Sequence, residues 1–230
     1  MTAPERTRAR RPKVVLFDVF ETLLEVDALR SRMVDVGRPE HELELFFTRT
    51  LRDGMALSLA GESPDFLDVA RSALIGTSGR RLSEEAVQHV LAGFAELPPC
   101  PDVEPALIAL ARAKIPAYAF THGPAKVVRE ALDRAQLRSY LRGVISCEEI
   151  GSFKPPAKVY QWACRQVNSD PARTALVAVH SWDVHGAVRA GLLAGFATRR
   201  EGGMSDVFDP PHVVADALDV VIERLVALPT

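Results

Sequence analysis

Asp18, Thr121, Lys154 and Asp183 are polar residues at or near the ends of short apolar runs, and their types suit nucleophilic chemistry. Because the carboxyl end of a parallel strand opens into the crevice where α/β sheets bind ligands, a carboxylate there is placed to react. A carboxylate is a weak nucleophile in water and becomes effective once a site desolvates and orients it. A neighbouring lysine would keep it ionised. The sequence therefore predicts Asp18 as a nucleophile and Lys154 as its counter-ion.

Thr121 and His122 lead directly into a predicted helix that begins at Pro124. A helix N-terminus offers free backbone donors and the positive end of the helix dipole, which favour an anion. We therefore expect this segment to hold the anionic part of a substrate. Asp183 is expected to orient Lys154 or a water molecule, and the alternative or additional role is to cap the helix that follows it.

Each of these interpretations has a plainer alternative. Many aspartates at strand ends only cap the next turn, but the convergence of Asp18, Lys154 and Asp183 favours catalysis. His122 and His180 either activate a water molecule or are ordinary loop histidines with satisfied hydrogen bonds. A metal site formed by His180, Asp183 and His185 is a weak signal at this spacing.

The segment from Phe17 to Thr22 resembles the nucleophile motif of the haloacid dehalogenase superfamily, in which the aspartate attacks the substrate and the threonine closes the loop. The type II L-2-haloacid dehalogenases are the most similar branch, because Phe153-Lys154-Pro155 and Trp182-Asp183 also match. The resemblance implies hydrolysis through a covalent aspartyl ester.

Two departures from the superfamily's phosphatases favour carbon–halogen chemistry. The resemblance places a second aspartate two residues after the nucleophile in phosphatases, where it protonates a leaving alkoxide, and here that position is Phe20. The acidic residue that magnesium-dependent members carry before the counterpart of Asp183 is replaced by Val179 and Ala178. A halide leaves without a proton, so the resemblance implies a metal-free site, and Mg²⁺ belongs only to a phosphatase alternative.

Other departures concern the substrate site. Type II dehalogenases use a cap arginine to clamp the substrate, and the register places Phe46 or Phe47 there, with Arg49 and Arg52 one turn away as substitutes. Glu21 stands where the family commonly has glycine, and His122 and His180 stand where it usually has asparagine.

These residues need a scaffold, and the alternation of apolar runs with helical patterns predicts an α/β protein with a Rossmann-like parallel sheet core and an inserted all-helical cap. We expect a disordered tail over residues 1–12, the core over 13–25 and 98–230, and the cap over 26–97. Prolines 98, 99 and 101 predict a hinge at the second boundary. Predicted strands after the first are 115–120, 143–146 and 175–179, with edge strands at 196–198 and 213–215. Predicted helices of the core are 103–113, 124–137, 156–167, 184–192 and 216–228.

Composition limits the partners. The chain has 230 residues, a net charge of −2 and 25% charged residues, so nothing global attracts nucleic acid or an anionic membrane. Three cysteines without CxxC spacing suit a reducing compartment, and no segment has the roughly 20 apolar residues of a membrane span. We expect a cytoplasmic protein with a small anionic substrate and no organic cofactor, and the sequence leaves a homodimer open.

The favoured hypothesis is hydrolytic dehalogenation of a small 2-haloacid. The alternatives are a phosphatase acting on a small activated phosphate and a non-catalytic protein that keeps the fold to bind a ligand or partner. The expected catalytic residues are Asp18, Lys154, Asp183, Thr121 and His180, and the expected substrate-binding residues are Phe20, Thr22, His122, Trp182, Arg49 and Arg52.

Overall fold

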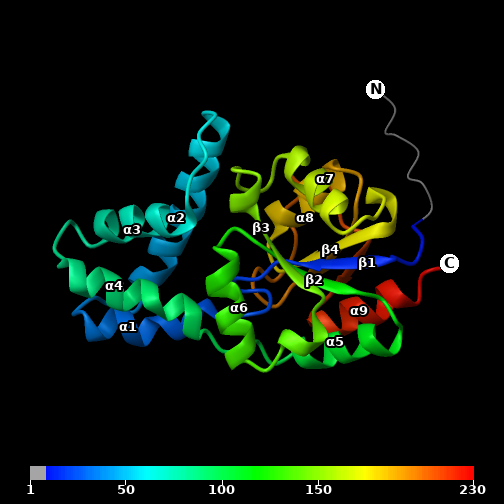
Figure 1. Ribbon diagram of the computed structural model, residues 1–230, viewed down its shortest axis with the longest axis horizontal. Helices are drawn as coiled ribbons and strands as arrows, with labels where there is room; N and C mark the ends of the chain where they lie inside the picture. The colour runs from blue at the N-terminus through cyan, green and yellow to red at the C-terminus, as the bar shows by residue number, and fades with distance from the viewer. Residues whose placement is uncertain (1–8) are drawn as a thin grey trace.

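One parallel sheet forms the centre of the protein in the computed structural model, which describes residues 9–230 (Figure 1). Its strands lie in the order β3-β2-β1-β4-β5-β6 and all neighbouring pairs are parallel. The strands are β1 (Val14–Phe17), β2 (Ala117–Thr121), β3 (Gly143–Ser146), β4 (Thr174–Ala178), β5 (Leu193–Ala197) and β6 (Val213–Ala215). The predicted Rossmann-like α/β core is confirmed.

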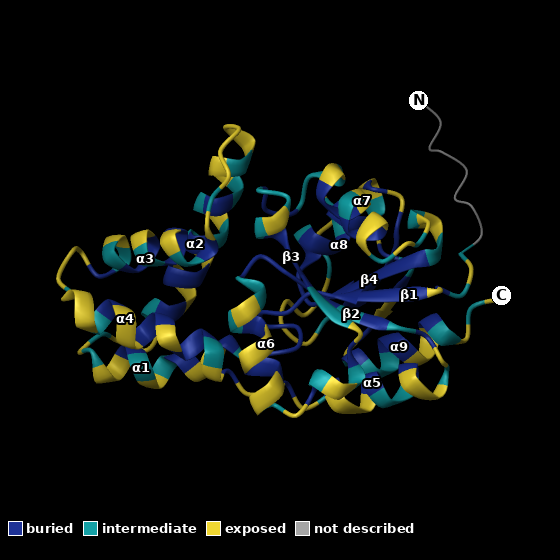
Figure 2. Ribbon diagram, in the orientation of Figure 1, coloured by how far each residue is buried: buried dark blue, intermediate teal, exposed yellow. Residues whose placement is uncertain are grey.

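Helices cover both faces of the sheet, as Figure 1 shows, with α5, α6 and α9 on one face and α7 and α8 on the other. Their bounds are α5 (Val103–Arg112), α6 (Ala125–Arg134), α7 (Ala157–Gln166), α8 (Ser181–Arg189) and α9 (Leu218–Val226). Successive side chains of a strand point to opposite faces. In β1, Val15 and Phe17 join the core that includes α5 and α9, whereas Val14 and Leu16 join the core of α7 and α8. All four are buried, which explains the continuous apolar run (Figure 2).

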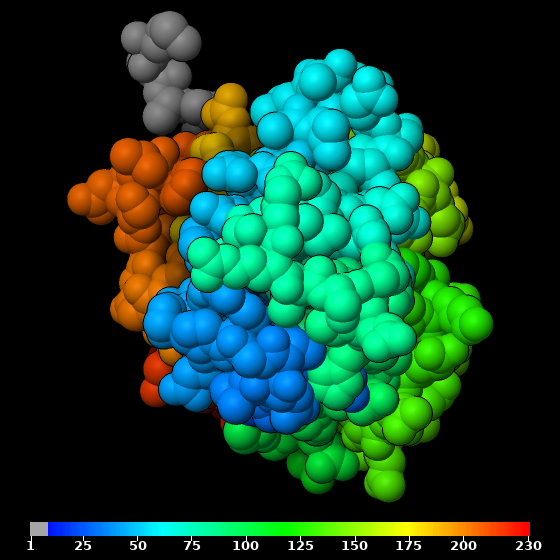
Figure 3. All heavy atoms as spheres, turned by 90° about the vertical axis from the view of Figure 1, so that its left-hand side faces the viewer, coloured from blue at the N-terminus to red at the C-terminus, as the bar shows by residue number. Residues whose placement is uncertain are grey.

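An all-helical cap is inserted after β1, as predicted. It contains α1 (Leu29–Asp35), α2 (Glu42–Leu59), α3 (Phe66–Thr77) and α4 (Glu84–Ala92), with 3-10 helices at Val26–Ala28 and Gly93–Glu96. The predicted N-cap of α4 is confirmed, because the Ser83 side chain accepts a hydrogen bond from the Ala86 N–H. Asp65 caps α3 in the same way. In Figure 3 the cap faces the viewer, coloured blue to blue-green, and parts of the core are visible on both sides of it.

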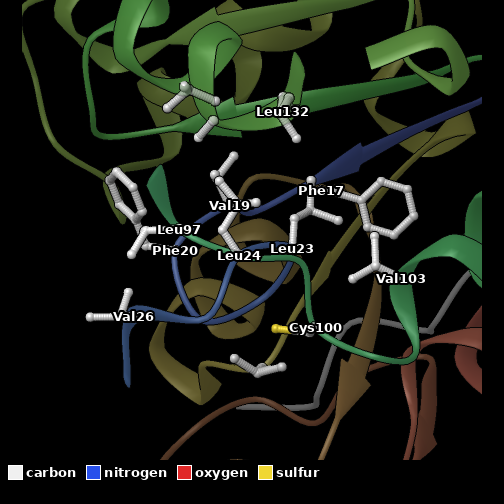
Figure 4. Close-up of a cluster of buried hydrophobic side chains, with 14 of the residues drawn as sticks. Phe17, Val19, Phe20, Leu23, Leu24, Val26, Leu97, Cys100, Val103 and Leu132 are labelled. Carbon is white, nitrogen blue, oxygen red and sulfur yellow. The ribbon is translucent and has the colours of Figure 1, made fainter. Parts of the chain in front are cut away.

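Two short segments connect the cap to the core and run antiparallel. The Glu25 N–H donates to the Pro98 carbonyl at 2.8 Å, and the Cys100 N–H donates to the Leu23 carbonyl at 3.0 Å. Apolar side chains surround this neck, including Val19, Leu23, Leu24, Val26, Leu97 and Cys100 (Figure 4). The pairing supports the proposed limits of the cap at residues 26 and 97.

Two predicted elements were placed wrongly. The strand predicted at 196–198 as an edge is β5, which begins at Leu193 and lies inside the sheet between β4 and β6. Gly195 permits this, because a Cβ there would lie 2.5 Å from the Val221 side chain of α9. Helix α8 begins at Ser181 rather than at residue 184, because His180 takes an extended conformation and is its N-cap.

Of the tail predicted over residues 1–12, the structure describes only residues 9–12. Residues 1–8 lie outside the described residues, so most of the predicted tail of residues 1–12 does too. Arg11 is held, because its N–H donates to the Pro229 carbonyl at 2.7 Å and its guanidinium donates to the Ala113 carbonyl at 3.1 Å. Within residues 9–230, none of the helices has the length and apolar character needed to cross a bilayer.

The cap contacts the core at the loop that carries Lys154. The Phe153 N–H donates to the Ser58 hydroxyl of α2 at 2.8 Å. Gly54, one turn earlier, faces the fully buried ring of Phe153, and a Cβ at Gly54 would lie 2.2 Å from that ring. Only glycine allows α2 to approach this closely.

We predict that Gly54→Ala lowers the free energy of unfolding by about 1–3 kcal/mol, because the added methyl group overpacks a contact that cannot yield. The matched control is Gly76→Ala in α3, where a Cβ would meet no atom within 4 Å. There the same change should stabilise the protein by about 0.4–1 kcal/mol. Urea unfolding measures both, and equal effects at the two positions would contradict the close approach.

Candidate active site

The Lys154 ammonium lies between two buried carboxylates. Its Nζ atom is 2.8 Å from Oδ1 of Asp18 and 2.5 Å from Oδ2 of Asp183. All three side chains are almost completely buried. Asp18 follows β1 directly, and Asp183 lies in the first turn of α8, which follows β4, the neighbour of β1. The sheet thus brings together residues that are distant in sequence.

The protonation states follow from this arrangement. Burial alone would raise the pKa of Asp18, but Lys154 and His180 outweigh it and hold the pKa of Asp18 well below its ordinary value. Burial alone would lower the pKa of Lys154, but Asp18 and Asp183 raise it above its ordinary value. An ionised carboxylate facing a charged ammonium is therefore the stable state at neutral pH.

Tyr160 is a site residue that was not predicted from the sequence. Its hydroxyl lies 2.6 Å from Oδ1 of Asp183 and 3.1 Å from the Asp183 carbonyl. Burial raises the pKa of Asp183, Lys154 lowers it, and the charge of Asp18 raises it again. The pKa of Asp183 is therefore above its ordinary value. Because Lys154 and Tyr160 bind one oxygen each, the Asp183 side chain is fixed. It does not cap α8, so that alternative is wrong.

Thr22 holds the nucleophile loop closed. Its hydroxyl donates to Oδ2 of Asp18 at 2.8 Å and accepts the Val179 N–H at 3.2 Å. Thr22 is fully buried and is absent from the lining of the large cavity described below. Its position therefore suits a residue that fixes Asp18 against β4, in contrast with the substrate-binding role expected from the sequence.

Thr121 and His122 lie in the loop before α6, where the sequence predicts an anion seat. The Thr121 hydroxyl accepts the Gly123 N–H at 2.9 Å, and Ser146 donates to the Gly123 carbonyl at 2.8 Å, so the loop is fixed. His122 is buried, and within residues 9–230 neither of its ring nitrogens has a hydrogen-bond partner. Burial, followed by the charge of Lys154, holds the pKa of His122 well below its ordinary value. A neutral imidazole with a free donor beside Lys154 suits an anionic ligand.

His180 lies between two carboxylates. Its Nδ1 atom is 3.2 Å from Oδ2 of Asp18, and its Nε2 atom is 2.7 Å from Oε2 of Glu21. Burial alone would lower the pKa of His180, but hydrogen bonds to Asp18 and Glu21 raise it to about 9. The imidazole is therefore protonated at neutral pH when Asp18 is a free carboxylate.

Glu21 and Arg200 are functional candidates that the sequence analysis did not select. Oε1 of Glu21 is 2.5 Å from the Arg200 guanidinium. The backbone of Glu21 has a φ of 67°, a left-handed conformation that costs a non-glycine residue about 1–2 kcal/mol. Arg199 donates to the carbonyls of Glu21 and Thr22, which offsets part of that cost. The departure from glycine at position 21 was the sequence signal that could have identified it.

A cavity of about 890 Å³ lies beside the site, and Glu21, His180, Trp182 and Arg200 line its core side, whereas Asp18, Thr121, His122 and Lys154 are not part of its lining. Trp182 stacks on His180 with a centroid separation of 5.4 Å, so this wall is partly aromatic. Phe20 does not line the cavity. It packs against Gly123 and the cap rings Phe47, Phe66 and Phe94.

The cap side of the cavity includes a row of apolar side chains on α2, beside the polar residues Glu44, Thr48 and Arg52. Leu43, Phe47, Leu51, Met55 and Leu59 recur every four residues and all line the cavity. Each member lies about one turn from the last and is rotated by about 40°, so the row winds along the helix and spans about 24 Å at 1.5 Å per residue. Of the two candidates for the cap arginine position, Phe47 faces the cavity, whereas Phe46 is fully buried and is absent from its lining.

Only one of the two arginines proposed as substitutes reaches the cavity. Arg52 lines it and pairs with Asp53 at 2.7 Å. Arg49 donates to the Thr77 hydroxyl of α3 at 3.1 Å and does not line the cavity. Arg49 lies about 200° around the helix from Phe47, so its expected substrate contact is wrong.

The three residues of the weak metal hypothesis do not converge on one point. His185 is turned toward Asp209, whose N–H donates to the His185 Nδ1 atom at 2.9 Å. His180 and Asp183 contact Asp18, Glu21 and Lys154 as described. Among residues 9–230, no group of three or more His, Cys, Asp or Glu side chains is arranged to hold a metal ion.

The chain is similar to known proteins over most of its length. Residues 12–191 match a family model described as haloacid dehalogenase-like hydrolase. (S)-2-haloacid dehalogenase 1 of Pseudomonas sp. (strain CBS-3) is 29% identical over 180 residues, covering 76% of this chain and 79% of the relative. A glyceraldehyde 3-phosphate phosphatase of Methanopyrus kandleri is 29% identical over 222 residues, covering 92% and 93%. The L-2-haloacid dehalogenase from Xanthobacter autotrophicus with chloropropionic acid covalently bound has the same fold, with a TM-score of 0.85 at 21% identity over 94% of this chain and 99% of that one.

We predict that Lys154→Met lowers the free energy of unfolding by about 3–5 kcal/mol at pH 8, because two buried carboxylates lose their cation. Without it, burial places the pKa of Asp183 above its value in the unfolded chain, so the folded state binds more protons. The deficit should therefore shrink between pH 8 and pH 5. Urea unfolding at both values measures this. Lys158→Met, at an exposed position of α7, is the control and should change stability by less than about 0.5 kcal/mol.

Proposed function

Since the chain belongs to the haloacid dehalogenase-like hydrolases, we propose that it hydrolyses the carbon–halogen bond of a 2-halo acid through an aspartyl ester on Asp18. The observation that carries this proposal is the ionised, desolvated Asp18 carboxylate held by Lys154, with Phe20 in the place of a leaving-group acid. A carboxylate in this state is an effective nucleophile toward carbon. The haloacid dehalogenase among its relatives supports the choice of substrate class.

In the first step an oxygen of Asp18 attacks C2 of the acid as the C2–halogen bond breaks, so the halide leaves with the bonding electron pair. Thr121, His122 and Lys154 would hold the substrate carboxylate. The free N–H groups at the start of α6 add to this seat. Holding both reactants in line removes much of the entropic cost of the step.

In the second step a water molecule attacks the Asp18 carbonyl carbon, and the bond between that carbon and the ester oxygen attached to C2 breaks. The products are a 2-hydroxy acid and a regenerated carboxylate that carries one oxygen from water. His180 is within reach of the ester and is the proposed base, and Asp183 holds Lys154 in place throughout. No part of this scheme uses a metal ion.

The volume of the cavity bears on the size of the substrate. About 890 Å³ is near the upper end of the roughly 300–1,000 Å³ that small-molecule sites occupy. A three-carbon acid leaves most of it unfilled, whereas a hydrocarbon tail would lie along the apolar row of α2. We therefore propose that acids with longer tails are better substrates than the smallest ones.

A phosphatase is the second candidate, since a phosphatase of Methanopyrus kandleri matches over nearly the whole chain. Magnesium-dependent phosphoryl transfer does not suit these residues. Phe20, Val179 and Ala178 supply no carboxylate oxygen, and the Lys154 ammonium already lies between Asp18 and Asp183. A cation beside that ammonium would be repelled.

A panel of short and long 2-halo acids, and of phosphate esters with and without Mg²⁺, tests the proposal. We predict metal-independent halide release, faster with 2-chlorooctanoate than with 2-chloropropionate, and a loss of at least about 10⁴-fold in Asp18→Asn. Asp133→Asn, exposed on α6, is the control and should keep wild-type activity. In a single turnover in heavy-oxygen water, the label should enter Asp18. Turnover of phosphate esters alone would contradict the proposal, and no turnover would favour a binding protein.

The missing cap arginine gives another prediction. Phe47→Arg should lower KM for 2-chloropropionate by roughly tenfold or more, because a guanidinium would bind the small carboxylate inside the cavity. Leu51→Arg places the same charge one turn farther along α2 and is the matched control. Steady-state kinetics decide between them, and a lower KM in Leu51→Arg alone would contradict the assignment of position 47.

A further inference from the structure

Four charged side chains form a continuous chain from the nucleophile to the rim of the cavity. Asp18 contacts Nδ1 of His180, Nε2 of His180 contacts Glu21, and Glu21 contacts Arg200. Arg200 also pairs with Asp27 of the cap at 3.4 Å. The three inner members are buried, so water does not screen their interactions.

Glu21 and His180 are departures from the resembling branch, which usually has glycine at position 21 and asparagine at position 180. These departures touch each other at 2.7 Å, although 159 positions separate them in sequence. Glu21 keeps its left-handed φ of 67° in this contact. A strained residue that is retained beside a reacting group indicates a functional contact.

The contact fixes what His180 can do. A carboxylate on Nε2 holds the proton on that nitrogen, so Nδ1 is the nitrogen that exchanges a proton on the Asp18 side. The Trp182 ring stacks on the imidazole and keeps it in this plane. The charged or titratable groups facing His180 are Asp18, Glu21, His122 and, beyond them, Lys154 and Arg200. Of these, only Asp18 changes charge when the ester forms.

We propose that Glu21 is a positioning residue that makes His180 the base for ester hydrolysis, and that esterification of Asp18 switches this base on. The inference rests on the function proposed above and extends it to the pair formed by Glu21 and His180. Glu21 acts through His180 and does not touch the reacting atoms.

The protons balance as follows. With Asp18 free, the imidazole carries both protons and donates to Asp18 and Glu21. Ester formation neutralises Asp18, so His180 loses one of its two anionic partners and its pKa falls from about 9. The proton on Nδ1 then leaves to solvent. Bare Nδ1 takes one proton from the attacking water, and the other ends on the hydroxy acid. Over a turnover one halide, one proton and one hydroxy acid are released.

The order in which the proton, the halide and the hydroxy acid are released tests the inference. In wild-type protein at pH 7.5, a stopped-flow indicator should record one proton in the same phase as the halide, before the hydroxy acid appears. His180→Asn should release halide in the first turnover at a rate within about threefold of wild type, with the proton delayed. Its ester hydrolysis should slow by roughly 100-fold or more, so that intact mass spectrometry finds the ester accumulating.

Glu21→Gln tests the positioning role. It should slow ester hydrolysis by at least about tenfold and leave the halide phase in place, because the base keeps its ring but loses the carboxylate that orients it. The double variant Glu21→Gly, His180→Asn carries the pair of residues usual in the resembling branch. Because that pair suits the fold, the double variant is the control for misfolding as the cause of slower ester hydrolysis. Asp209→Asn removes the carboxylate beside the other His–Asp pair, with His185, and should behave as wild type.

A readout without substrate separates this inference from the proposed function. Nitrogen-15 NMR of the His180 imidazole should show a higher midpoint in wild type than in Glu21→Gln, with His185 unchanged. An unchanged midpoint would overturn the inference whatever the activity, as would a proton released only with the hydroxy acid. Absence of halide release from every acid would overturn the proposed function, and with it the catalytic half of the inference.

Discussion

The ammonium of Lys154 is the group on which the rest of the site depends. A fully buried ammonium is costly unless it is paired, and here Asp18, directly after β1, and Asp183, in the first turn of α8, pair with it. Each carboxylate is in turn fixed by a hydroxyl, Thr22 for Asp18 and Tyr160 for Asp183. The order of β1 and β4 in the sheet, the start of α8 and the loop after β3 must all be correct before these charges can meet. The charges therefore constrain the fold as strongly as they serve the chemistry.

The sequence predicted what local patterns determine. Apolar runs ending in Asp18 and Thr121 predicted strand ends correctly, because a strand buried on both faces reads as a continuous apolar segment. The helical cap followed from spacing and from capping residues such as Ser83. Boundaries were less accurate where an extended residue, His180, caps a helix earlier than periodicity indicates. The inner position of β5 depends on a glycine that admits α9, which is a tertiary effect.

Contacts between distant segments could not be predicted in this way. The pairing of Glu21 with His180 needs both the left-handed backbone at Glu21 and the sheet register, and neither is visible in a linear pattern. Arg49 and Arg52 were indistinguishable until the face of α2 was known. The same helix reaches the Lys154 loop through Gly54 and Ser58, so the cap both bounds the cavity and supports the counter-ion of Asp18.

The antiparallel neck at Leu23–Glu25 and Pro98–Cys100 has an evolutionary meaning. Because the cap leaves and re-enters at one place, its helices could diverge in sequence, or be exchanged whole, while the sheet beneath kept its strand order. A substitution on the cavity face of α2, for example at Phe47, would then change selectivity within one module. A graft of another family member's cap that preserved the two paired backbone segments would inherit the same reactive carboxylate and present it to a different molecule.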